Sequence, residues 1–181
     1  MDHEFQKIPL QRLENDNHHI ESEWIAKESI LTLHCLDMNS EKTPHVTLLG
    51  TPTKIKELHI GHIYCEGLTE SIPSSNLVEY QIEDGKVDSF YHSELHSRPE
   101  HRLITSSCGA CNHPDLSVNP NHDTIIPETR QLSFDELRIA LETMRKEMVL
   151  FQKTGGCHGA GLLNYNGNVL YVSEDLSLIH I

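Results

Sequence analysis

The chain has 181 residues, of which 37% are hydrophobic and 23% are charged, enough for one ordinary domain or two small ones. Its net charge of −13 argues against a broad basic surface for nucleic acid or an anionic membrane. No apolar run approaches the ~20 residues that span a bilayer. Five cysteines form no regular framework, so we expect a reducing, cytoplasmic location.

The N-terminal segment, residues 1–25, is polar and lacks hydrophobic periodicity, so we expect a loose tail. Residues 26–99 predict a strand-rich α+β unit. Its expected strands are bounded by turn residues and lie at residues 30–36, 45–49, 77–82 and 86–91. The first two can pair as a hairpin, and Asp84-Gly85 is a strong hairpin signal between the last two.

One helix is expected inside this unit, over residues 53–66. Thr51-Pro52 is typical of a helix start with proline in the first turn, and Gly67 provides a stop. Apolar residues and histidines recur on one face between these signals. The helix is therefore expected to pack against the strands.

Two closely spaced cysteines, Cys108 and Cys111, follow a short strand expected at residues 103–105. Gly109 lets the backbone bend, so that both sulfurs can reach one metal, one substrate or each other. An isolated CxxC is compatible with half of a zinc site, a dithiol redox pair, or a sulfur relay in which one thiolate carries a persulfide. We expect Cys35 and Cys65 to be small core residues instead.

The clearest helix is expected over residues 133–151, where Ser133 and Glu136 predict a capping box. Its apolar side chains recur at helical spacing and are expected to face the core. They are Phe134, Leu137, Leu141, Met144, Met148 and Phe151.

A glycine-rich bend, residues 154–161, follows this helix. The N–H groups of Gly155 and Gly156 can contact a phosphate or a cofactor, with His158 as a further polar contact. A helix C-cap followed by a close-packed strand would explain the glycines equally well. Beyond the bend, Asn166-Gly167 predicts a hairpin turn between strands expected at residues 162–165 and 168–173.

Several of these blocks, in one order, resemble the FdhD family of formate dehydrogenase accessory sulfurtransferases. The matching blocks are Glu28, Thr51-Pro52, Glu57-Leu58, Gly61 to Gly67, residues 105–111, Thr154-Gly155-Gly156-Cys157-His158 and Glu174-Asp175. After Asp175 the family's Gly-Arg-His-Asn continuation does not follow. We therefore expect a C-terminally truncated chain whose residues 176–181 are non-native.

The resemblance implies a sulfur carrier, or sulfurtransferase, that passes persulfide sulfur from a cysteine desulfurase to the molybdenum cofactor for formate dehydrogenase maturation. That cofactor, a molybdopterin guanine dinucleotide, would be a bound substrate. The implied site residues are Cys108 and Cys111 as the catalytic pair, and Thr154, Gly155, Gly156 and His158 for the cofactor.

The resemblance also implies the fold class. It is an α/β protein in which the N-terminal α+β unit is followed, over residues 100–175, by an incomplete cytidine-deaminase-like α/β unit. We expect no tightly bound metal and no nucleic-acid or membrane partner, and a homodimer is compatible with the sequence.

Two other functions stay open. Zinc-dependent deaminases carry H-x-E before P-C-x-x-C, and this chain has His92-Ser93-Glu94 before its cysteine pair. However, no proline precedes Cys108, and only 13 residues separate it from Glu94. The other alternative is a non-catalytic chaperone that holds the cofactor or the apoenzyme, and such a protein would bind its partners without either thiol.

Overall fold

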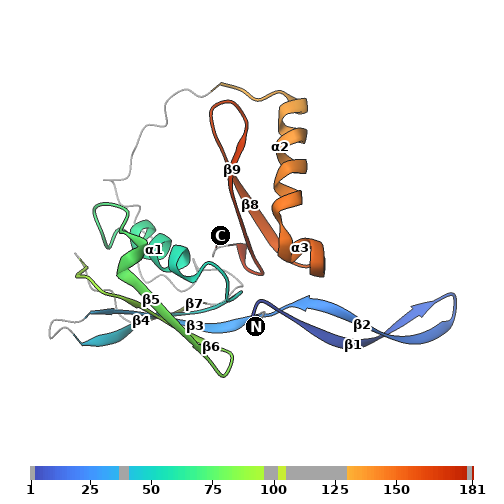
Figure 1. Ribbon diagram of the computed structural model, residues 1–181, viewed down its shortest axis with the longest axis horizontal. Helices are drawn as coiled ribbons and strands as arrows, with labels where there is room; N and C mark the ends of the chain where they lie inside the picture. The colour runs from blue at the N-terminus through green and yellow to red at the C-terminus, as the bar shows by residue number, and fades with distance from the viewer. Residues whose placement is uncertain (1–2, 37–40, 96–101, 105–129, 179–180) are drawn as a thin grey trace.

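The computed structural model describes residues 3–36, 41–95, 102–104, 130–178 and 181, and these form a strand-rich, mixed α/β structure. Figure 1 shows three parts: a five-stranded sheet with a helix above it, a long hairpin at the N-terminus, and a pair of helices beside a second hairpin. We call these the sheet unit, the N-terminal hairpin and the C-terminal unit. None of the helices in the described ranges has the length and apolar character needed to cross a membrane.

The sheet unit combines parallel and antiparallel pairing, in the order β5-β6-β3-β4-β7. Its strands are β3 (Ser29–Leu36), β4 (Lys42–Gly50), β5 (Val78–Glu83), β6 (Lys86–Tyr91) and β7 (Arg102–Ile104). The β3–β4 and β5–β6 pairs are antiparallel, as predicted, whereas β3 pairs with β6 and β4 with β7 in parallel. Asp84 and Gly85 both have positive φ, 49° and 75°, as a tight hairpin turn requires.

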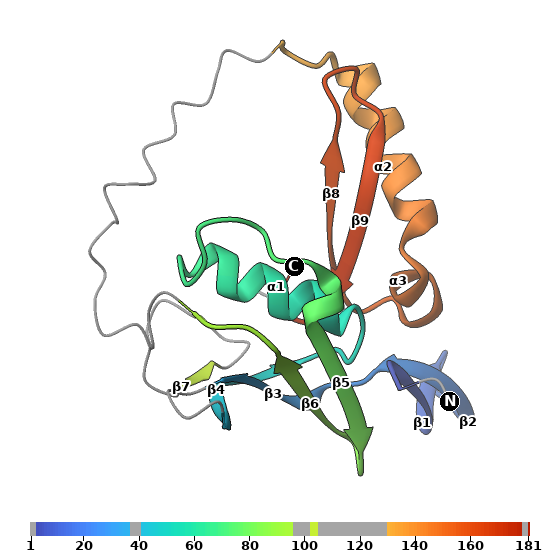
Figure 2. The same ribbon diagram turned by 60° about the vertical axis from the view of Figure 1, so that its left-hand side comes forward.

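The helix α1 (Ile55–Cys65) lies over one face of this sheet in both views (Figures 1 and 2). Burial alternates along β3, so every second side chain points to the helix. The resulting core has two clusters: Leu31, Leu33, Val46, Leu48, Ile55 and Val87 in one, and Cys35, Ile60, Ile63, Leu68, Val78 and Tyr91 in the other. A short 3₁₀ turn (Ser75–Leu77) leads into β5.

The N-terminal hairpin corrects the expectation of a loose tail. β1 (Phe5–Glu14) and β2 (Asn17–Ala26) pair antiparallel over their whole length. The turn residues Asn15 and Asp16 both have positive φ, which Asn and Asp tolerate better than other non-glycine residues. Arg12 forms ion pairs with two glutamates of the opposite strand. Polar cross-strand pairs therefore replace the apolar alternation that predicts a strand.

The C-terminal unit contains α2 (Phe134–Glu147), α3 (Val149–Thr154), β8 (His158–Leu163) and β9 (Val169–Asp175). The predicted single helix over residues 133–151 is divided at Met148, where ψ is 80°. α2 lies along the β8–β9 hairpin in Figures 1 and 2. A Cβ at Gly159 would lie 2.4 Å from Met148 Cε, and one at Gly161 would lie 3.0 Å from Met144 Sδ. The two glycines thus let the helix approach closely.

Apart from Met144 and Met148, the apolar residues predicted to face the core from α2 are exposed, so that expectation was wrong. Phe134 is 92% exposed, and Leu137 and Leu141 are also exposed. The reason is the width of the sheet, because β8 and β9 form a sheet of only two strands and it is Met144 and Met148 that contact their glycines. Helical periodicity therefore identified the helix correctly but overestimated how much of it is buried.

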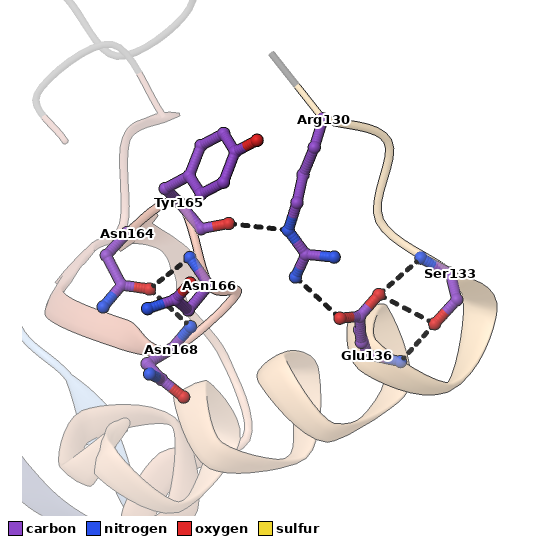
Figure 3. Close-up of polar contacts among 7 residues, drawn as sticks. All are labelled: Arg130, Ser133, Glu136, Asn164, Tyr165, Asn166 and Asn168. Carbon is purple, nitrogen blue, oxygen red and sulfur yellow. Dashed lines mark hydrogen bonds and ion pairs between the residues drawn. The ribbon is translucent and has the colours of Figure 1, made fainter.

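The start of α2 is tied to the β8–β9 turn by polar contacts (Figure 3). Ser133 and Glu136 form the predicted capping box. Arg130 Nη2 donates to Glu136 Oε1 at 2.6 Å, and its Nε donates to the Tyr165 carbonyl at 2.8 Å. The Arg130 hydrogen bond, followed by those from Ser133, lowers the pKa of Glu136 to about 2. Asn164 Oδ1 closes the turn by accepting the N–H groups of two residues that follow it.

Candidate functional site

The predicted site residues fall into two groups. Cys108 and Cys111 lie outside the described residues, so their predicted role as a pair stays a prediction. Thr154, Gly155 and Gly156 lie at the end of α3, and His158, the first residue of β8, is exposed. The bend that joins α3 to β8 is the part of the candidate site that the structure describes.

Thr154 and Gly155 end the helix in a defined way. Gly155 is the C-cap with φ of 69°, in the left-handed region that glycine adopts without steric cost. Its N–H donates to the Phe151 carbonyl at 2.7 Å. The Thr154 hydroxyl donates to the Leu150 carbonyl at 2.8 Å and accepts the Gly156 N–H at 3.3 Å. The bend is therefore held by its own backbone and by one hydroxyl group.

This arrangement changes the expected chemistry of the bend. Both glycine N–H groups have acceptors within the chain, so they are not a preformed phosphate cradle. The two glycines are exposed, and a Cβ at Gly155 would meet nothing within 4 Å. The helix C-cap and the close-packed strand are both present. What the bend offers a ligand is an accessible backbone surface beside the exposed imidazole of His158.

Glu174, the first residue of the Glu174-Asp175 motif, holds the other end of α3. Its carboxylate accepts the N–H of Leu150 at 3.0 Å and of Phe151 at 2.7 Å. Because α3 has no side-chain cap of its own, this carboxylate on β9 satisfies donors at the start of the helix. Cys157 Sγ also donates to Glu174 Oε1 at 3.3 Å. Burial, and then Glu174, raise the pKa of Cys157 to about 12.

Asp175 joins the C-terminal unit to the sheet unit. Its carboxylate accepts the Thr51 N–H at 2.9 Å and the Ser177 N–H at 2.7 Å. In return, the Thr51 hydroxyl accepts the Leu176 N–H at 3.2 Å. Thr51, Asp175 and Ser177 are all buried. Thr51-Pro52 and Glu174-Asp175, two blocks far apart in the sequence, thus meet at one junction. Whether residues 176–181 are non-native stays a prediction.

The other described cysteines differ from each other. Cys35 is buried as expected, and burial raises its pKa to about 12. Its sulfur lies 4.0 Å from His59 Nε2, and His59 Nδ1 lies 2.8 Å from Ser89 Oγ. Burial, and then neighbouring histidines, lower the pKa of His59 to about 3, so this ring is neutral. Cys65 was wrongly expected in the core, because its position at the end of α1 leaves it exposed.

The residues that suggested a deaminase lie after β6 and outside any helix. His92 Nε2 lies 3.2 Å from the carboxylate of Glu79 on β5. Within the described part of the chain, no group of three or more His, Cys, Asp and Glu side chains could hold a metal ion. His92-Ser93-Glu94 therefore follows a strand instead of opening a helix, and because Cys108 and Cys111 lie outside the described residues, the deaminase site stays an alternative prediction.

Comparison with known proteins identifies the family. The model of the FdhD/NarQ family matches residues 32–177, which include the CxxC, the glycine bend and both blocks of the junction. The chain belongs to the FdhD/NarQ family. This confirms the resemblance found in the sequence.

Curated relatives and a solved structure agree with this assignment. A protein named "Sulfur carrier protein FdhD" from Sulfurisphaera tokodaii is 25% identical over 172 residues, covering 94% of this chain and 64% of the relative. Its namesake from Thermoplasma acidophilum is 30% identical over 163 residues, covering 86% and 57%. The chain thus spans less than two thirds of the length of these relatives.

The fold is also similar to that of a crystal structure from Desulfotalea psychrophila, named as a formate dehydrogenase accessory protein. The TM-score is 0.60 at 14% identity, and the match covers 98% of this chain and 65% of the other. At this identity, the likeness supports the mixed α/β fold alone.

Proposed function

We propose that this FdhD/NarQ family chain is a sulfur carrier that acts in the maturation of formate dehydrogenase. The observation that carries the proposal is the family match, which spans the CxxC and the glycine bend in one alignment. Proteins named as sulfur carriers among its relatives support the same role. Residues 100–175 would then form the incomplete cytidine-deaminase-like unit that the family resemblance implies.

The reaction that we propose begins at Cys108 or Cys111. A thiolate of this pair attacks the terminal sulfur of a persulfide on a cysteine desulfurase. The cysteine of the desulfurase leaves as a thiolate, and the carrier gains one sulfur atom. The second thiol can then attack the inner sulfur, which forms a disulfide and releases sulfide to the acceptor. The acceptor would be the molybdenum cofactor, as substrate, and this transfer would make the chain a sulfurtransferase.

The pKa values of Cys35 and Cys157 support Cys108 and Cys111 as the sulfur-carrying pair. Cys35 and Cys157 both have a pKa raised to about 12, and a thiol that stays protonated is a poor acceptor of sulfane sulfur. Cys65 is exposed, so it is the natural control. The raised pKa values therefore argue against Cys35 and Cys157 as sulfur carriers, and substitution of Cys65 tests the remaining cysteine.

Intact-protein mass spectrometry tests the proposal. After incubation with a cysteine desulfurase and cysteine, the chain should gain about 32 Da, and reduction should remove this mass. At least one of the two variants Cys108→Ser and Cys111→Ser, the one that lacks the sulfur-carrying thiol, should lose the adduct, whereas Cys65→Ser should keep it. An adduct that survives in both CxxC variants, or that is absent from the folded wild-type chain, would contradict sulfur carriage by this pair.

We also propose that the glycine bend contacts the cofactor. The accessible surface at Gly155 and Gly156, beside the exposed His158, supports this placement. Guanosine diphosphate, which carries the guanosine and both bridging phosphates of the proposed cofactor, is a soluble probe. His158→Ala should weaken its binding, measured by calorimetry, whereas His18→Ala in the exposed N-terminal hairpin should not. Equal binding by both variants would place the nucleotide elsewhere.

A further inference from the structure

Two histidine rings from different elements point the same nitrogen at each other. His45 Nε2 lies 3.1 Å from His62 Nε2, with ring centroids 5.2 Å apart and ring planes tilted by 50°. His45 lies on β4 and His62 on α1. The contact is distinct from the glycine bend and from the cysteine pair of the proposed function.

An irregularity in the sheet places His45 on the helix side. Leu33 pairs with Val46, but the next residue, His34, pairs with Pro44, so His45 is the extra residue of a β-bulge. A regular strand would direct neighbouring side chains to opposite faces. Here His45 and Val46 are both buried. The bulge therefore adds the imidazole of His45 to the buried face of the sheet, next to Val46.

The distance between the two nitrogens matches a shared metal ion. Two nitrogens bound at about 2.1 Å to one metal lie about 3.0 Å apart at a right angle and about 3.4 Å apart at the tetrahedral angle. The observed 3.1 Å lies between these values. Imidazole nitrogens suit zinc, copper and nickel, and affinity rises toward the later metals of this series.

The surroundings favour an open site of two protein ligands. His59 lies one turn before His62 on α1, but its two nitrogens already face Ser89 and Cys35. His62 is half-buried, which leaves a path for an ion and for water. Among the described residues, no third His, Cys, Asp or Glu side chain joins this pair to form a metal site. Solvent would therefore complete the coordination of the ion.

We propose that His45 and His62 are the two protein ligands of a site for a divalent late transition-metal ion, of the class of Ni²⁺, Cu²⁺ and Zn²⁺. The ion replaces the hydrogen bond between the rings and links β4 to α1. Both rings bind as neutral imidazole, so acid releases the ion. This site is separate from sulfur carriage. It also departs from the expectation, drawn from the sequence, of no tightly bound metal.

Calorimetric titration with Ni²⁺ tests the proposal on the full chain. His62→Gln and His45→Gln should each weaken one equivalent of binding at least about tenfold, as loss of a ligand should exceed the loss of a supporting contact. The matched control is His19→Gln on the exposed N-terminal hairpin, which should keep that equivalent. Every variant retains all five cysteines, so any Ni²⁺ that binds to thiols is bound equally by the wild type and the variants. A loss of binding relative to the wild type therefore reports the histidine site.

Thermal unfolding provides a second measurement. Because the ion binds the folded chain, Ni²⁺ should raise the Tm of the wild type and of His19→Gln, but not of His62→Gln. Should a variant fail to fold, paramagnetic broadening in the wild type by Ni²⁺ should concentrate on β4 and α1. Unchanged stoichiometry in both variants, or broadening centred elsewhere, would overturn the proposal and leave only the hydrogen bond between the two rings.

Discussion

Apolar side chains are distributed differently in the sheet unit and in the C-terminal unit. The sheet unit buries aliphatic residues from β3, β4, β6 and α1 in continuous clusters. In the C-terminal unit, Leu162, Leu170 and Tyr171 are exposed on the β8–β9 hairpin. Hydrogen bonds between Asp175 and Thr51, and between Leu176 and Thr51, hold the C-terminal unit to the sheet unit. The comparison indicates that hydrophobic burial stabilises the sheet unit, whereas hydrogen bonds position the C-terminal unit.

The sharpest test of this difference compares two leucines. Leu33 is 0% exposed and Leu162 is 58% exposed. Leu33→Ala should lower the free energy of unfolding by about 3 kcal/mol, because it removes buried methyl groups and leaves a cavity. Leu162→Ala should change it by less than about 0.5 kcal/mol. Urea denaturation measures both values, and similar losses in the two variants would show that the contrast in burial does not govern stability.

The junction between the units is the next target. Asp175→Ala should cost about 2–3 kcal/mol, because it leaves the buried N–H groups of Thr51 and Ser177 without their charged acceptor. Asp175→Asn keeps one acceptor oxygen and should cost less. Hydrogen exchange should accelerate in β9 more than in β3. Uniform acceleration throughout the chain would instead mean that the units unfold as one.

Acid should destabilise the sheet unit through His59. Its pKa is lowered from 6.5 to about 3 in the folded chain, mainly by burial. The unfolded chain therefore binds a proton that the folded chain does not, and stability falls as the pH drops below 6.5. The loss from pH 6.5 to 5 should be about 2 kcal/mol, at about 1.4 kcal/mol per pH unit.

The variant His59→Gln isolates this contribution. Glutamine does not titrate, so the slope of unfolding free energy against pH should become shallower by about one proton in this range. Gln6→Ala, at an exposed position of the N-terminal hairpin, removes no titratable group and should leave the slope unchanged. An unaltered slope in His59→Gln would assign the acid sensitivity to other groups.

Local signals predicted much of both units. Asp84-Gly85 identified the β5–β6 hairpin, and the Ser133 and Glu136 spacing identified the start of α2. Each signal depends on backbone conformations of residues close in sequence, which the residue types restrict directly. The glycine bend was also located correctly, and its C-cap was one of the two interpretations that the sequence left open.

Long-range features were not visible in the same way. Thr51 and Asp175 are 124 positions apart, and no local pattern indicates that they meet. The β-bulge at His45 depends on the pairing of β3 with β4, which the sequence indicates without fixing its register. In the N-terminal hairpin, polar cross-strand pairs concealed two strands, although Asn15-Asp16 was a turn signal that could have revealed them.

The smallest expected effect concerns the contact between the N-terminal hairpin and the C-terminal unit. Lys153 Nζ on α3 lies 3.4 Å from the ring centroid of Phe5 and 4.0 Å from that of Trp24. The two rings meet edge to face at 5.7 Å. Lys153→Met keeps most of the apolar stem but removes the charge, so the loss should be about 0.5–1 kcal/mol.

Trp24 is the single tryptophan of the chain, so its fluorescence reports this contact directly. Lys153→Met should change the emission of the folded protein, because the ammonium group no longer lies over the indole. Lys146→Met, at an exposed position of α2, should leave the emission unchanged. Equal spectra for the wild type and both variants would mean that the Lys153 ammonium group does not hold the hairpin against α3 in solution.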